Sequence, residues 1–172
     1  SAAKYIATTL MELNLDAKVY DKGQVVVIEI MGRNAGWLTA AASLAGYKGL
    51  GADLIYLPEV PFSVEKFKKD VKRVMDENGG KCIACVSEGI RDKDKNFIVE
   101  KLSQEKAKDN FGHTQLGGLA IQLADLISQE YGVKVRGVEF SLMQRSAAHL
   151  ASGVDVEEAF LAGREAVKVA CA

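Results

Sequence analysis

The sequence predicts an α/β fold in three layers, α/β/α, with a mostly parallel β-sheet between two layers of helices. Segments with strand-like and helix-like patterns alternate along the whole chain of 172 residues. The strand-like segments are nearly continuous apolar runs, as is typical of parallel strands covered on both faces. No internal repeat, low-complexity segment or linker interrupts this pattern, so residues 1–172 are expected to form a single domain.

Helical segments show apolar residues three or four positions apart and polar residues at their ends. They cover residues 1–13, 37–45, 64–78 and 113–132, and a last helix begins near residue 155. Ser63 is placed to cap the third of these helices, and Asp155 with Glu158 is expected to form a capping box for the last. Trp37 is expected to pack in the core.

Extended segments lie between the helices and cover residues 25–30, 53–59, 81–88 and 133–140. Cys82 and Cys85 form a C-x-x-C pair within the third of them. Side chains three apart on a strand point to opposite faces, so we expect two buried thiols rather than a zinc or redox site. An odd total of three cysteines argues against a disulfide scaffold and indicates a reducing, cytoplasmic location.

Composition argues against several kinds of partner. The net charge is −1, whereas binding to nucleic acid or to a membrane surface favours a basic excess, so neither is expected. No apolar run reaches the ~18 residues of a membrane span. His113 and His149 have no acidic or cysteine partner at ligand spacing, so we expect no metal site in this chain. The glycine-rich phosphate-loop and dinucleotide-binding patterns are absent.

The chemistry is expected at the carboxyl ends of the strands, where open α/β sheets bind ligands. These ends carry Met31-Gly32-Arg33, Pro58-Glu59, Ser87-Glu88-Gly89, and Ser141 followed by Gln144-Arg145. Arginine binds phosphate oxygens in a fork, and a carboxylate accepts hydrogen bonds from sugar hydroxyls. This combination of side chains suits a phosphorylated polyol.

Several of these residues also have a purely structural explanation. Arg33 stands at a helix start, where free N–H groups favour an anion, but it could equally pair with a neighbouring acid on the surface. Arg136 lies within a strand, where a charge must be paired or face solvent, so it either serves a ligand or marks an edge strand. Gly117 and Gly118, within a helical pattern, mark either a close approach or a ligand contact.

Taken together, the motifs resemble the 6-phosphofructokinase family. The matching stretches are "VVVIEIMGRNAGWLTAAASLA", "LIYLPEVPF", "ACVSEGI", "VRGVEFSLMQRSAAHLAS" and "DNFGHTQLGGLAIQLADLI", the last being similar to the branch that includes pyrophosphate-dependent enzymes. They follow one another across essentially the whole chain. The resemblance implies a glycolytic phosphotransferase that converts fructose 6-phosphate to fructose 1,6-bisphosphate, with Mg²⁺ and either ATP or pyrophosphate as donor.

The resemblance also implies roles for residues of the first and third strand ends. Met31 and Gly32 would line the sugar, and Arg33 would stabilise the phosphoryl group during transfer. Glu88 would hold a sugar hydroxyl. Positioning and electrostatic stabilisation of this kind account for most of the catalysis in phosphoryl transfer.

Arg145 and Arg136 would grip the 6-phosphate, with Arg136 reaching in from a neighbouring subunit of a homo-oligomer. Glu59 matches the position of an effector-site glutamate in allosteric members of the family. The chain departs from the family pattern at Leu142, where many members have a histidine, and at Gln24, where many have another arginine.

The donor loop and the catalytic base of the family would precede residue 1, and the chain begins without a methionine. We therefore expect the excised, C-terminal sugar-phosphate half of such an enzyme, which lacks its N-terminal donor-binding half. Alone, this half should catalyse nothing and should bind neither Mg²⁺ nor a phosphoryl donor. The alternative is a stand-alone sugar-phosphate-binding or regulatory module without catalysis.

Overall fold

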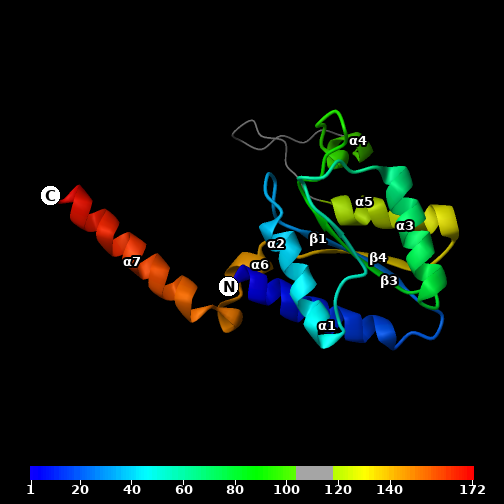
Figure 1. Ribbon diagram of the computed structural model, residues 1–172, viewed down its shortest axis with the longest axis horizontal. Helices are drawn as coiled ribbons and strands as arrows, with labels where there is room; N and C mark the ends of the chain where they lie inside the picture. The colour runs from blue at the N-terminus through cyan, green and yellow to red at the C-terminus, as the bar shows by residue number, and fades with distance from the viewer. Residues whose placement is uncertain (104–117) are drawn as a thin grey trace.

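A parallel sheet of four strands forms the centre of the computed structural model, which describes residues 1–103 and 118–172 (Figure 1). The strands are β1 (Val25–Ile30), β2 (Leu54–Tyr56), β3 (Cys82–Ser87) and β4 (Val135–Glu139), in the order β2-β3-β1-β4. Every neighbouring pair is parallel. The helical elements are α1 (Ala2–Lys18), α2 (Trp37–Ala40), the 3₁₀ helix η1 (Ala41–Lys48), α3 (Val64–Glu77), α4 (Ile98–Leu102), α5 (Leu119–Tyr131), α6 (Met143–Ser146), the 3₁₀ helix η2 (Ala148–Leu150) and α7 (Gly153–Ala170).

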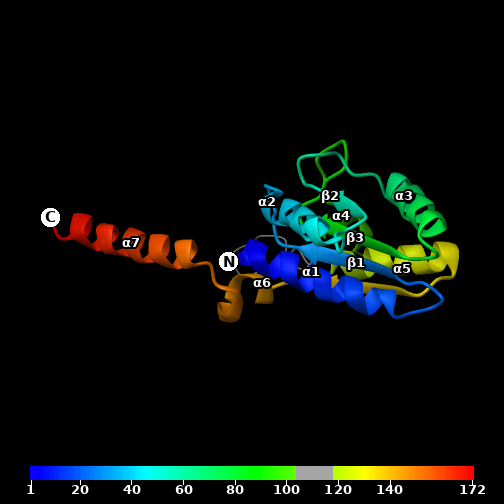
Figure 2. The same cartoon turned by 60° about the horizontal axis from the view of Figure 1, so that its bottom comes forward.

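Helices cover both faces of the sheet, which confirms the predicted three layers (Figure 2). On one face, Val25 and Val27 of β1 join a core with residues of α3 and α5. On the other face, Val26 and Ile28 join a core with residues of α1 and η1. Because side chains alternate along a strand and both faces are covered, every residue of β1 is buried, and this explains its continuous apolar run.

The two cysteines of the C-x-x-C pair lie on opposite faces of β3, as predicted. Cys82 belongs to the core on the α3 and α5 side, and Cys85 belongs to the core on the α1 side. Both are buried free thiols. Burial raises the pKa of both thiols, that of Cys85 to about 12. Among the described residues, no group of three or more His, Cys, Asp or Glu side chains is placed to hold a metal ion.

The observed helix ends agree with the predicted ones in one case and differ from them in two. Ser63 caps α3 as predicted, since its Oγ accepts a hydrogen bond from the Lys66 backbone N–H at 3.3 Å. The first helix runs on to Lys18, beyond the predicted residue 13, because Ala17 continues its buried face. The capping box at Asp155 is wrong, since α7 already begins at Gly153 and Asp155 instead pairs with the amino group of Ser1.

The prediction that Trp37 packs in the core is also wrong. Its side chain is 84% exposed on the outer face of α2. The side of α2 and η1 that faces the body is lined by small residues, Thr39, Ala41 and Ala42. These short side chains let the helical turn lie close to the sheet, and the bulky indole points the other way.

Helix α7 extends away from the body of the structure, and none of its residues is buried (Figure 1). Its exposed apolar side chains include Val156, Phe160 and Val167. No helix in the described ranges is long and apolar enough to cross a membrane.

Candidate functional site

The turn after β1 lies at the carboxyl edge of the sheet, which faces left in Figure 1. Gly32 has a φ of 148°, a backbone conformation that side chains with a Cβ rarely adopt. A Cβ at this position would also lie only 2.7 Å from the carbonyl oxygen of Ala35. The glycine is therefore needed for the tight turn that brings Arg33 to the edge of the sheet.

Two side chains at the end of β3 hold this turn. Glu88 accepts a hydrogen bond from the Gly32 backbone N–H at 3.1 Å through Oε1. The hydroxyl of Ser87 donates to the carbonyl oxygen of Gly32 at 2.5 Å. The second carboxylate oxygen of Glu88 accepts no hydrogen bond from the described residues, so it is available for a hydroxyl group of a ligand.

The backbones of Gly89 and Arg33 are in direct contact, because a Cβ at Gly89 would lie 2.1 Å from the carbonyl oxygen of Arg33. The side chain of Arg33 is exposed, and it forms no ion pair with a carboxylate in the described ranges. Asn34, next in the chain, accepts a hydrogen bond from Nη2 of Arg91 at 2.8 Å. No pattern in the sequence pointed to this contact between Arg91 and Asn34.

Glu59 supports the far end of the same turn. Its Oε1 accepts a hydrogen bond from the Gly36 backbone N–H at 2.7 Å. The carboxylate therefore helps to fix residues 32–36 and with them Arg33. Its suggested part in an effector site stays a prediction.

The turn after β4 brings a second arginine to the carboxyl edge. Arg145 lies on α6, is exposed and forms no salt bridge with the described residues. Gln144 beside it is only 1% exposed. Its Oε1 accepts a hydrogen bond from the Met31 backbone N–H at 3.3 Å, and its Nε2 donates to the carbonyl oxygen of Ser141 at 2.9 Å.

Arg136 lies at the opposite end of the sheet. It is exposed and is paired in register with Val26 near the start of β1, five residues before Met31. At the rise of a parallel strand this separation is about 16 Å. Within one chain Arg136 therefore does not join Arg33 and Arg145. It lies on an edge strand, and its Nε donates to Oε1 of the buried Gln24 at 3.4 Å.

Glu29 is a buried charge that sequence reasoning missed, although it is the only charged residue in the run "VVVIEI". It is 5% exposed, and its Oε2 accepts a hydrogen bond from the Ala120 backbone N–H at 3.0 Å, at the start of α5. Burial raises the pKa of Glu29 to about 7; the hydrogen bond from Ala120 opposes this, and the negative charges of Glu139 and Glu88 add to it. Glu29 thus anchors α5 to the sheet beside the candidate site.

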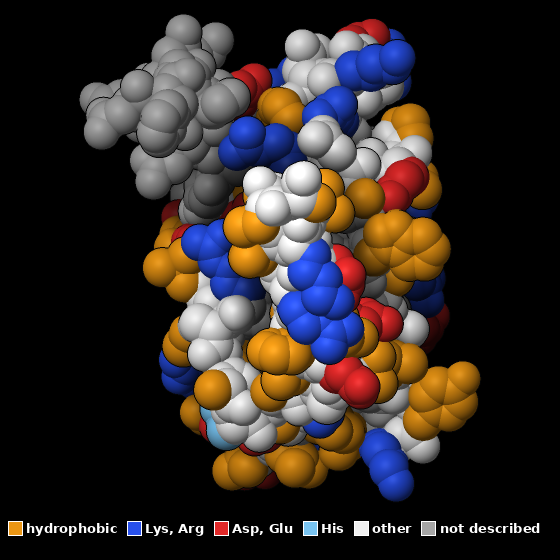
Figure 3. Space-filling view, turned by 90° about the vertical axis from the view of Figure 1, so that its left-hand side faces the viewer, with side chains coloured by type: hydrophobic (Ala, Val, Ile, Leu, Met, Phe, Trp, Pro, Cys, Tyr) orange, Lys and Arg blue, Asp and Glu red, His pale blue; other side chains and the backbone are white. Residues whose placement is uncertain are grey.

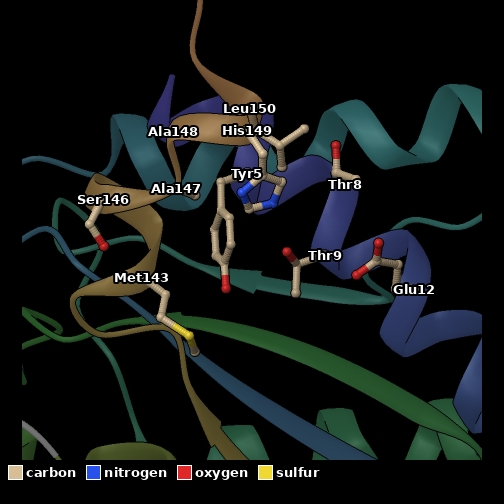
Figure 4. A pocket seen from close by; sticks show the side chains of 10 residues that line it. All are labelled: Tyr5, Thr8, Thr9, Glu12, Met143, Ser146, Ala147, Ala148, His149 and Leu150. Carbon is tan, nitrogen blue, oxygen red and sulfur yellow. The ribbon is translucent and has the colours of Figure 1, made fainter.

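Viewed from the left of Figure 1, the surface carries Lys and Arg side chains scattered among hydrophobic ones (Figure 3). A pocket of about 650 Å³ lies between α1 and the segment 143–150 (Figure 4). It is lined by Tyr5, Thr8, Thr9, Glu12, Met143, Ser146, Ala147, Ala148, His149 and Leu150. It offers no lysine or arginine, so it is unsuited to a phosphate group.

Two residues named in the sequence analysis, His113 and Gly117, lie outside the residues that the structure describes.

The chain matches the family described as Phosphofructokinase over residues 1–138. It is 43% identical over 173 residues to pyrophosphate–fructose 6-phosphate 1-phosphotransferase from Xanthomonas campestris pv. campestris, covering 99% of this chain and 40% of that protein. The same enzyme from Halomonas elongata is 39% identical over 177 residues, with 99% and 40% covered. The chain thus spans about 40% of the length of these curated relatives.

A solved structure shares the fold over nearly the whole chain. It is the pyrophosphate-dependent phosphofructokinase from Marinobacter aquaeolei, with a TM-score of 0.76 and 34% sequence identity. The match covers 99% of this chain and 38% of the other.

Proposed function

This chain belongs to the phosphofructokinase family, and on that premise we propose that it supplies the fructose 6-phosphate site of a phosphotransferase that forms fructose 1,6-bisphosphate. One observation carries the proposal: the hydrogen bond from Gly32 to Glu88 joins the Arg33 turn to the glutamate at the end of β3. Two residues suited to a sugar phosphate, one with a guanidinium and one with a carboxylate, are thereby held at the edge where such sheets bind ligands.

Each side chain has a part that follows from its position. The Oε2 of Glu88 accepts a hydrogen bond from a sugar hydroxyl while Oε1 keeps the turn in place. The exposed guanidinium of Arg33, in the turn before the short helix α2, stabilises the negative charge of the phosphoryl group during transfer. Met31 and Gly32 line the sugar, and Arg145 binds the 6-phosphate.

Arg136 serves the site of a second copy of the chain in a homo-oligomer. Its place near the amino end of β4 supports this assignment, because it is separated from its own chain's Met31 by most of the length of β1. Gln24 accepts the hydrogen bond that holds its guanidinium at the edge strand.

The phosphoryl donor is pyrophosphate, in keeping with the names of the relatives from Xanthomonas and Halomonas, and ATP is the alternative. The rest of the polypeptide holds the donor, its Mg²⁺ and the catalytic base. The chain alone is inactive, and the complete enzyme works in cytoplasmic glycolysis.

The experiment is an assay of the complete gene product with fructose 6-phosphate and either pyrophosphate or ATP. We expect phosphorylation with pyrophosphate and none by the 172-residue chain alone. Arg33→Ala should lower kcat more than it raises KM, and Arg145→Ala should mainly raise KM, because the two arginines hold different phosphoryl groups. If the complete gene product transfers a phosphoryl group from neither pyrophosphate nor ATP, the proposal is refuted. A sugar-phosphate-binding module would then be the better description.

A further inference from the structure

Gln144 is a polar side chain that is almost completely buried on a four-residue helix at the surface of the molecule. Burying an amide is unfavourable unless both of its ends are hydrogen-bonded. Both ends of the Gln144 amide are hydrogen-bonded, and the two partners belong to different turns. The oxygen accepts from Met31 after β1, and the nitrogen donates to Ser141 after β4.

The two partners flank the two arginines of the carboxyl edge. Met31 is two residues before Arg33, and Ser141 is four residues before Arg145. Ser141 has a φ of 42°, in the left-handed region that a residue with a Cβ adopts at a cost. An unfavourable backbone conformation of this kind persists only where its surroundings hold it, and the hydrogen bond from Gln144 is one such restraint.

We infer that Gln144 is a positioning residue that fixes the Arg33 turn relative to Arg145. The inference rests on the proposed function, since it assumes that Arg145 binds the 6-phosphate while Arg33 acts on the phosphoryl group that is transferred to the same sugar. A shift of about 1 Å between a group that binds the substrate and a group that acts on the reacting atoms can cost on the order of a hundredfold in rate. A single buried amide that bonds to both turns is suited to prevent such a shift.

Two substitutions in the complete gene product test the two hydrogen bonds of the Gln144 amide. Gln144→Met has a similar volume and loses both hydrogen bonds. Gln144→Glu keeps an acceptor for Met31 and loses the donor to Ser141, so only the Arg145 side is released. We expect Gln144→Met to raise KM for fructose 6-phosphate and to lower kcat, each by about tenfold or more. Gln144→Glu should raise KM while kcat stays within about twofold.

Asn14→Leu is the matched control for the loss of a buried amide. Asn14 is 9% exposed on α1, and its Nδ2 donates to the carbonyl oxygen of Gly51 at 3.0 Å, away from the candidate site. This variant should lower the melting temperature without changing KM or kcat. Ser141→Gly added to Gln144→Met should recover melting temperature, because glycine adopts the positive φ freely, but it should not recover KM.

The outcomes are distinct. If the wild-type protein neither binds nor phosphorylates fructose 6-phosphate, the proposed function fails and the positioning role fails with it. If the wild type is active and both Gln144 variants keep its KM and kcat, only the positioning role is overturned. It is also overturned if Ser141→Gly restores melting temperature and KM together, since Gln144 would then act on folding alone. Should Gln144→Met not fold, the KM of Gln144→Glu decides.

Discussion

Gly89→Ala gives a direct test of how the candidate site is built. Gly89 is buried, and its backbone lies against the backbone of Arg33. The methyl group of alanine would lie 2.1 Å from the Arg33 carbonyl oxygen, whereas real Cβ contacts stay beyond 3.0 Å. The turn must therefore move by about 0.9 Å. Because Met31 and Gly32 of this turn line the sugar, a displacement of this size should weaken fructose 6-phosphate binding by roughly ten- to a hundredfold, and overpacking should destabilise the fold by about 1–3 kcal/mol.

The assay combines calorimetric titration of fructose 6-phosphate with urea unfolding, on the complete gene product. Gly46→Ala is the control, because a Cβ at Gly46 meets nothing within 4 Å and its backbone conformation is ordinary. It should bind as the wild type does and unfold at the same or a slightly higher urea concentration. If Gly89→Ala folds and binds fructose 6-phosphate as tightly as Gly46→Ala, the contact with Arg33 does not position the site.

Three further predictions concern stability and reactivity. Burial in the folded chain raises the pKa of Glu29 from its ordinary value of 4.5 to about 7, so the free energy of unfolding should fall by about 3 kcal/mol as pH rises from 4.5 through 7. Glu29→Gln should remove that fall in urea titrations at pH 5 and pH 8, and an unchanged pH profile would contradict the assignment. Ser63→Ala should cost about 1 kcal/mol of unfolding free energy, because α3 loses its cap. Iodoacetamide should label the exposed Cys171 in the folded chain while sparing the buried Cys82 and Cys85, and fast labelling of all three would contradict their burial.

The parallel sheet and its two helical layers were predictable because local patterns decide them. An apolar run such as residues 25–28 can only be a strand buried on both faces or part of a buried helix, and the short length between turns favoured the strand. The position of Trp37 was not predictable in this way. Whether a large apolar side chain at a helix start faces inward depends on the packing distance to the sheet, which the sequence pattern does not contain.

The candidate site was predictable as a set of strand ends, since parallel strands bring their carboxyl ends to one edge. Its internal contacts were not. Glu59 and Glu88 were expected to face ligands, yet each carboxylate also holds a backbone N–H of the Arg33 turn. Gln144 and Glu29 gave only weak signals, because a polar residue in an apolar context shows that it needs a partner without showing which one.

The central claim is that a sugar phosphate binds at the carboxyl edge through Arg145 and its neighbours. Calorimetric titration of fructose 6-phosphate into the complete gene product tests it most directly, with fructose and inorganic phosphate as control ligands. The control variant is Arg73→Ala, whose guanidinium pairs with Glu77 at 3.1 Å on the exposed side of α3. The account predicts saturable binding that Arg145→Ala weakens by about tenfold or more, as the loss of a charge-assisted hydrogen bond requires. Equal affinity in the Arg145→Ala and Arg73→Ala variants would contradict the account.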